Sequence, residues 1–126
     1  TSARNGMVVA ILLVEDDESS ALFLKQILKD TGASVQHTTR GTEAVEIVRN
    51  NPKTDLILMD IHLPDKDGLT TTREIKSFAG DVVVIAQTAY AFSSDHFQAR
   101  KAGCDAFFTK PLVAPVLLEK MDTFLS

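Results

Sequence analysis

The stretch Ala10-Ile-Leu-Leu-Val-Glu-Asp-Asp17 joins five apolar residues directly to three acids. A short apolar run bounded by polar residues is typical of a strand buried inside a parallel sheet. Three further runs have the same form: Leu56-Ile-Leu-Met59, Val82-Val-Val-Ile-Ala86 and Ala106-Phe-Phe108. The four runs therefore predict neighbouring strands of one parallel sheet.

Polar side chains follow the four runs closely along the chain. They are Glu15, Asp16, Asp17, Asp60, Thr88 and Lys110. The carboxyl ends of the strands share one edge of an open parallel sheet, and ligands bind at that edge. Acids, a hydroxyl and an ammonium gathered there predict a site for a cation and a phosphoryl group.

Helix-like segments alternate with the strand-like runs. Apolar residues recur at helical spacing from Ala21 to Leu28 and from Ala44 to Val48, and a short strand candidate, Ser34 to Thr38, lies between them. Three more helices are expected over about 69–78, 94–102 and 113–124. Alternating strands and helices predict one α/β domain over 7–126, with a parallel sheet covered on both faces. Residues 1–6 are interpreted as a tag or linker.

The composition of the chain argues against several classes of protein. Thirteen Lys and Arg against seventeen Asp and Glu give a net charge of −4, which argues against a nucleic-acid surface. The chain contains no apolar stretch of the roughly 20 residues that a membrane span needs. The single cysteine, Cys104, excludes an internal disulfide and fits a reducing, cytoplasmic compartment.

The acids divide into two groups. Asp17 and Glu18 lead directly into a helix, so the simpler interpretation is that they cap it and complement its dipole. Glu15 and Asp16 follow one buried strand and Asp60 follows another. Like charges about 4 Å apart repel by roughly 1 to 4 kcal/mol, so such a cluster is expected to hold a cation. Oxygen ligands favour Mg²⁺ or Mn²⁺ over zinc.

Thr88 and Lys110 complete the predicted chemistry. A hydroxyl and an ammonium can each bond a phosphoryl oxygen. An aspartate can act as the nucleophile in phosphoryl transfer and form an acyl phosphate. Asp60 is the natural candidate for this nucleophile, because it is a single acid centred between the other groups.

At these residues the chain resembles the receiver domain of two-component response regulators, from about Met7 to Leu125. Four motifs carry the resemblance: Ile11-Leu-Leu-Val-Glu-Asp-Asp17, Leu58-Met-Asp-Ile-His-Leu-Pro64 with Asp67-Gly68, Gln87-Thr-Ala89, and Thr109-Lys-Pro111. The resemblance implies a flavodoxin-like (βα)5 fold with strand order 2-1-3-4-5. It also implies a regulatory domain, not an enzyme, that accepts a phosphoryl group from the phosphohistidine of a histidine kinase or phosphotransfer protein.

The resemblance assigns the metal site residue by residue. Asp60 would be the phosphoacceptor and a Mg²⁺ ligand. Asp16 would hold Mg²⁺ directly, Glu15 through water, and His62 through its backbone carbonyl.

The phosphoryl group would have its own partners by the same resemblance. Thr88 and Lys110 would each bind a phosphoryl oxygen, and Ala89 would offer its backbone N–H. The Lys110–Pro111 peptide is expected to be cis.

The resemblance also implies a conformational switch. Thr88 would be drawn toward the phosphate and would couple to an aromatic residue, which is often Tyr in this family and is Phe107 here. Phenylalanine can still move inward when Thr88 moves, but it lacks the hydroxyl and cannot hydrogen-bond through it. The responding surface would comprise the fourth helix, the fifth strand and the fifth helix. A phosphorylation-dependent homodimer stays open.

Two other functions compete with this interpretation. An aspartate-nucleophile phosphatase would need a second acid two residues after Asp60, where this chain has His62. A pseudo-receiver that only binds partners would be expected to lack an acid, the threonine or the lysine, and none is missing. The residues Met59–Pro64 slightly favour the receiver of a hybrid histidine kinase over a stand-alone regulator. The identity of the partner kinase stays open.

Overall fold

Five parallel strands form one sheet in the order β2-β1-β3-β4-β5, which confirms the expected topology. A computed structural model describes residues 8–89 and 93–125, so the segment 1–6 interpreted as a tag or linker lies outside the described residues. The strands are β1 Ala10–Val14, β2 Ser34–Thr38, β3 Leu56–Asp60, β4 Val83–Thr88 and β5 Ala106–Thr109. All four strand pairs are parallel.

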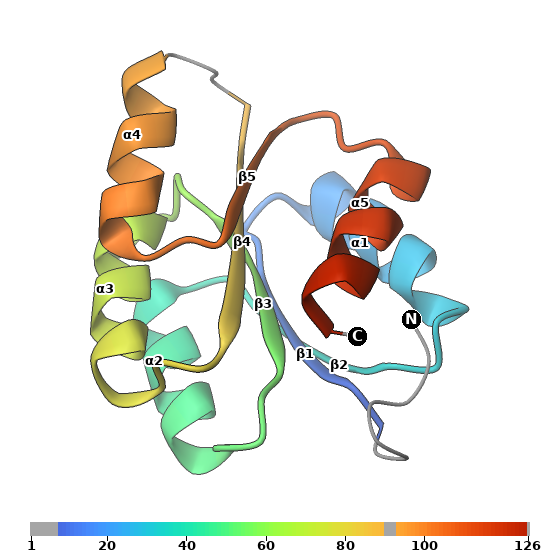
Figure 1. The fold of residues 1–126 in the computed structure, drawn as a ribbon, viewed down its shortest axis with the longest axis horizontal. Coiled ribbons are helices and arrows are strands. Elements are labelled where there is room, and N and C mark those ends of the chain that lie inside the picture. The colour runs from blue at the N-terminus through green and yellow to red at the C-terminus, as the bar shows by residue number, and fades with distance from the viewer. Residues whose placement is uncertain (1–7, 90–92, 126) are drawn as a thin grey trace.

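Five helices cover both faces of this sheet (Figure 1). They are α1 Glu18–Lys29, α2 Gly41–Asn50, α3 Gly68–Phe78, α4 Ser93–Ala102 and α5 Ala114–Leu125. Helices α1 and α5 lie on one face, and α2, α3 and α4 lie on the other. In the described ranges, none of these helices has the length and apolar character needed to cross a bilayer.

Strand alternation sorts the buried side chains into two cores. Leu13, Leu58 and Ile85 point toward α1 and α5, where Leu24 and Leu117 meet them. Their strand neighbours point the other way because successive side chains of a strand face opposite sides of the sheet. That second core contains Val14, Met59, Val84, Val45 and Ile75, and lies under α2 and α3.

Two strand ends differ from the apolar runs that predicted them. Strand β3 includes Asp60 and β4 continues to Thr88, because the backbone ladder pairs Asp60 with Gln87 and Thr88 with Thr109 whatever the polarity of their side chains. At the other end, the N–H of Val82 bonds the carbonyl of Ala79, which holds Val82 in the turn before β4. The polar residues of the site therefore belong to the ladder itself.

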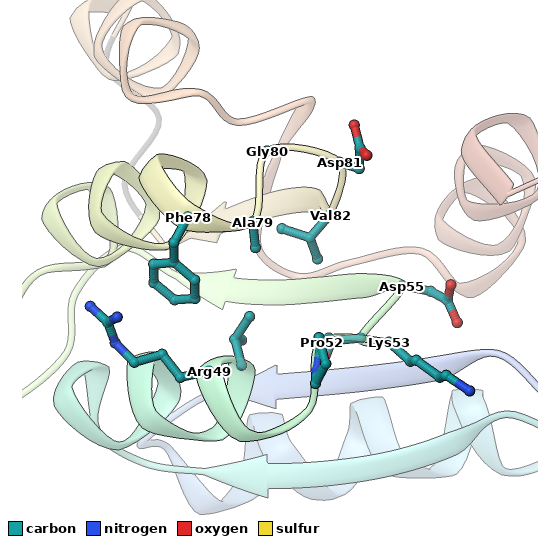
Figure 2. A pocket seen from close by; sticks show the side chains of 11 residues that line it. Arg49, Pro52, Lys53, Asp55, Phe78, Ala79, Gly80, Asp81 and Val82 are labelled. Atoms are coloured by element: carbon teal, nitrogen blue, oxygen red, sulfur yellow. The ribbon is translucent and has the colours of Figure 1, made fainter.

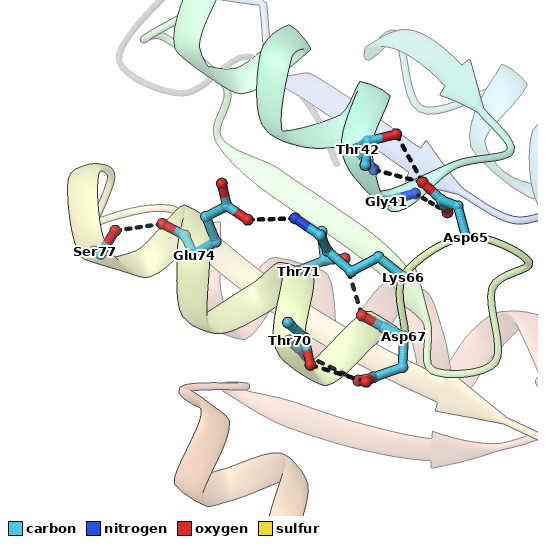
Figure 3. Close-up of polar contacts among 9 residues, drawn as sticks. All are labelled: Gly41, Thr42, Asp65, Lys66, Asp67, Thr70, Thr71, Glu74 and Ser77. Atoms are coloured by element: carbon cyan, nitrogen blue, oxygen red, sulfur yellow. Dashed lines mark hydrogen bonds and ion pairs between the residues drawn. The ribbon is translucent and has the colours of Figure 1, made fainter.

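The loop between β3 and α3 is fastened to two helices (Figure 3). The Asp65 carboxylate accepts hydrogen bonds from the backbone N–H groups of Gly41 and Thr42 at 2.9 and 3.0 Å, and from the Thr42 hydroxyl at 2.7 Å. It thereby caps α2 from another segment, since the side chain of the N-cap residue Arg40 makes no capping bond. Asp67 caps α3 through the backbone N–H of Thr70 at 2.9 Å.

Replacing Asp65 by Ala is expected to lower the free energy of unfolding by about 1 to 2 kcal/mol, the usual cost of a lost helix cap. Burial alone would raise the pKa of Asp65, but the hydrogen bonds from Thr42 and Gly41 outweigh it and hold the pKa well below the usual 3.8. The stabilisation is therefore present above about pH 4 and lost as the pH falls further.

Thermal unfolding of wild type and Asp65→Ala at pH 7 and at pH 2.5 measures this effect. The two proteins should differ clearly at pH 7 and less at pH 2.5. The exposed Asp81 provides the control, because Asp81→Ala should change little at either pH. An equal loss of stability in both variants at pH 7 would exclude the capping role.

Candidate functional site

The carboxyl edge of the sheet brings four charged or polar side chains to one face. Glu15 continues the row of Ile11 and Leu13 beyond β1, and Asp60 continues the row of Leu56 and Leu58. By the same alternation, Gln87 follows Ile85, and Lys110 follows Phe108. All four side chains therefore point to the side of the sheet that α1 and α5 cover.

Lys110 bridges two buried carboxylates at this edge. Its Nζ lies 2.7 Å from Glu15 Oε1 and 3.2 Å from Asp60 Oδ2. Glu15 is fully buried and Asp60 is 5% exposed. Taking these charges out of water would be costly without such a partner. The expected gathering of Glu15, Asp60 and Lys110 is thus present in the structure.

Hydrogen bonds orient the two carboxylates further. The backbone N–H of His62 donates to Asp60 Oδ1 at 3.0 Å, and that of Asp17 donates to Glu15 Oε2 at 3.1 Å. Each carboxylate is consequently held through both of its oxygens. These contacts give the Asp60 carboxylate a fixed orientation at the rim of the sheet.

Burial and neighbouring charges shift the pKa values of Glu15 and Lys110. Burial and the neighbouring Asp60 raise the pKa of Glu15 to about 7, although the Lys110 ammonium opposes the shift. Burial alone would lower the pKa of Lys110, but the hydrogen bond to Glu15 and the charge of Asp60 outweigh it and raise the pKa. Lys110 therefore stays protonated at neutral pH and provides a fixed positive charge.

Three acids lie close enough to share one cation. Ligand oxygens of Glu15, Asp16 and Asp60 all lie within 4.8 Å of one another. Asp16 is exposed, so the cluster is open to water on one side. A set of oxygen donors with room for water fits the coordination preferences of Mg²⁺ or Mn²⁺.

The other residues of the predicted site differ in their burial and in their contacts. Asp17 caps α1 by accepting the backbone N–H of Ser20 at 2.8 Å, as its simpler interpretation predicted. Thr88 is fully buried and ends β4, and Ala89 directly after it is exposed. The His62 side chain is also exposed. The Lys110–Pro111 peptide is cis, as expected.

The residue at the expected switch position contacts α4. Phe107 is half-buried, and its ring centroid lies 4.1 Å from that of His96 on α4. Alternation places Phe107 on the sheet face opposite to Phe108, the same face as Thr88. Thr88 and Phe107 thus lie on the side of the sheet that α4 covers.

Sequence reasoning missed one member of this edge. Gln87 is 1% exposed, and its Nε2 donates to Glu15 Oε1 at 3.2 Å. The available signal was a polar residue directly after the apolar run Val83–Ala86, inside a buried strand. The motif Gln87-Thr-Ala89 drew attention to Thr88 instead.

A separate pocket of about 680 Å³ lies at the opposite, amino edge of β3 and β4 (Figure 2). Arg49 stacks on Phe78 there, with Cζ 4.3 Å from the ring centroid. Asp55 also lines this pocket, but its carboxylate accepts the backbone N–H of Ala10 at 2.8 Å and so fastens β1. None of the acids near Lys110 lines this pocket.

Comparisons with known proteins agree with this fold. A relative from Brucella anthropi, the polar-differentiation response regulator DivK, is 33% identical over 94% of this chain and 98% of its own. A CheY-like receiver domain from Methanospirillum hungatei is 30% identical, with a TM-score of 0.88 over 94% of both chains. The receiver domain of Saccharomyces cerevisiae Ssk1, solved with the histidine phosphotransfer protein Ypd1, is 26% identical, with a TM-score of 0.86 over 94% of this chain and 89% of that one.

The doubly wound sheet and its acid–lysine edge define a regulatory signalling domain of the two-component class. The chain belongs to the response regulator receiver domain family, whose model matches residues 11–122.

Proposed function

We propose that this domain accepts a phosphoryl group on Asp60 from the phosphohistidine of a histidine kinase or phosphotransfer protein. The observation that carries the proposal is the position of Asp60, buried and ion-paired with Lys110 beside Glu15. The yeast relative was solved with a histidine phosphotransfer protein, which supports this class of partner. The domain acts as a substrate of the transfer and regulates others, so it is not an enzyme in its own right.

The transfer needs one bond to form and one to break. An Asp60 oxygen attacks the phosphorus, the new O–P bond forms, and the P–N bond to the imidazole breaks. The bond electrons return to the imidazole nitrogen, which takes up a proton from solvent. Transfer exchanges the single negative charge of the Asp60 carboxylate for a phosphoryl group that carries about −1.5 to −2, and the Lys110 ammonium, already 3.2 Å from Asp60 Oδ2, offsets part of that charge.

A divalent cation belongs to this proposal. Glu15, Asp16, Asp60 and the backbone carbonyl of His62 would hold Mg²⁺ or Mn²⁺. When bound, the ion supplies positive charge that neutralises phosphoryl oxygens. The Thr88 hydroxyl and the Ala89 backbone N–H would bind further phosphoryl oxygens.

The proposed conformational response depends on the positions of Thr88 and Phe107, which lie on the same face of the sheet. If Thr88 moves toward the phosphoryl group, space opens on the face of the sheet where Phe107 lies. Phe107 packs on His96, so its movement would reach α4. The proposed switch surface is therefore the α4-β5-α5 face, which could also support a phosphorylation-dependent homodimer. We place this signalling in the cytoplasm, where the free thiol of Cys104 would stay reduced.

The proposal is tested by intact mass spectrometry after incubation with acetyl phosphate and Mg²⁺. One labile phosphoryl group should appear on the wild type and should be absent when a chelator is added. Failure to gain any adduct in Mg²⁺ would favour a pseudo-receiver that only binds partners. Multiple turnover of p-nitrophenyl phosphate under the same conditions would instead revive the phosphatase interpretation.

A further inference from the structure

Gln87 holds an unusual position at the acidic edge. Its side chain is 1% exposed and shares a sheet face with the apolar Ile85 and Leu58. A buried amide is costly unless its groups are hydrogen-bonded. Only one half of this amide is paired: Nε2 bonds Glu15, whereas Oε1 is buried without a partner among the described residues.

This half-paired amide does not stabilise the fold efficiently. Leaving a buried carbonyl without a partner is unfavourable, and an apolar side chain of similar size would avoid that cost. The orientation is nevertheless the favourable one, because turning the amide over would place Oε1 against the Glu15 carboxylate. The presence of the amide is thus explained by the hydrogen bond that its N–H donates to Glu15.

Glu15 Oε1 accepts from two donors at once. Lys110 Nζ lies 2.7 Å away and Gln87 Nε2 lies 3.2 Å away. Binding of the Lys110 ammonium to a new phosphoryl oxygen would draw it from Glu15 toward Asp60. Lys110 and Gln87 both line a pocket of about 350 Å³ beside α1. Glu15, fully buried, would then lose one donor and keep the other.

We infer that Gln87 is a positioning residue for phosphoryl transfer: its amide keeps Glu15 oriented and hydrogen-bonded while Lys110 moves to the phosphoryl group. This inference rests on the proposed function and deepens it. Without the amide, Lys110 remains the main donor to Glu15 Oε1, and drawing it away leaves that oxygen short of a partner. Formation of the acyl phosphate is then opposed, although the unphosphorylated fold is intact.

The test compares wild type, Gln87→Met and the control Ile85→Met in Mg²⁺ with acetyl phosphate as donor. Gln87→Met should lower the maximal phosphorylation rate about tenfold, a fold-change at the lower end for a hydrogen bond to a charged group. The half-saturating acetyl phosphate concentration should stay the same, because Gln87 does not reach the donor. The melting temperature should be unchanged or higher, since the unpartnered carbonyl is gone. Ile85→Met lies on the same strand and face and should phosphorylate like wild type.

A double-mutant cycle with Glu15→Met, which removes the acceptor oxygen, separates positioning from general structure. If Gln87 acts through Glu15, the tenfold effect should shrink below twofold in the Glu15→Met background. A rate for Gln87→Met within twofold of wild type would overturn the inference, and so would an undiminished effect in that background. If Gln87→Met does not fold, Gln87→Leu replaces it. Its phosphorylation rate per folded molecule is then judged by the same twofold criteria. A wild type that gains no phosphoryl group would instead refute the proposed function, and this inference with it.

Discussion

Asp60→Asn is expected to abolish phosphorylation by acetyl phosphate, with a loss of at least about a hundredfold. The amide has almost the shape of the carboxylate, but its oxygen is a poor nucleophile toward phosphorus. The fold should survive the change. The Asn oxygen can still accept the backbone N–H of His62, and Lys110 keeps its bond to Glu15 at 2.7 Å. Intact mass and a circular dichroism spectrum of the same sample measure both results.

A second carboxylate-to-amide substitution is the matched control. Asp105 also pairs with a lysine, Lys76 at 3.1 Å, but it precedes β5 at the opposite edge of the sheet. Asp105→Asn should therefore gain the phosphoryl group at close to the wild-type rate. A labile adduct on Asp60→Asn, equal in amount to that on wild type, would assign the phosphoacceptor to another residue.

Gly68→Ala should be strongly destabilising. A Cβ at this position would overlap the carbonyl oxygen of Asp60 and lie 2.8 Å from the Cα of Ile61. These are backbone atoms, so the loop after β3 must shift to make room. Overpacking of this kind costs about 3 kcal/mol, which corresponds to a fall of roughly 10 °C in Tm for a domain of this size. Because the displaced atoms belong to Asp60 itself, phosphorylation should fall too.

Gly80→Ala is the control for this prediction. Its nearest contact would be the carbonyl oxygen of Lys76 at 3.8 Å, which is an ordinary van der Waals distance. Differential scanning calorimetry of the two variants should give a large fall in Tm for Gly68→Ala and a small change for Gly80→Ala. Similar melting temperatures for both would mean that the loop absorbs the extra methyl without cost.

Much of the fold could be predicted because its signals are local. Apolar runs such as Leu56–Met59 identify strands without any knowledge of their neighbours, and helical spacing identifies α1 and α2. The strand order came from the resemblance and is confirmed. The roles of single acids were also local in part: Asp17 directly precedes a helix, and it caps that helix.

The unpredicted features depend on contacts between distant segments. Asp65 caps α2 from 24 positions away from Gly41, so no local pattern reveals it. Lys110 forms ion pairs with both Glu15 and Asp60, and this pairing depends on where strands β1, β3 and β5 end in space. Gln87 bonds Glu15 across 72 positions. The expected origin from a hybrid histidine kinase stays a prediction.

The separation of the two hydrophobic cores by the sheet has an evolutionary consequence. Among the residues that the structure describes, no side chain belongs to both cores, because strand alternation directs each strand residue to a single face. Substitutions beneath α2 and α3 therefore require no compensating change beneath α1 and α5, where Glu15, Asp60 and Lys110 lie. The half that holds Glu15, Asp60 and Lys110 is therefore expected to vary less than the core beneath α2 and α3. Chimeras that exchange the α2–α3 block between relatives should accordingly keep their chemistry.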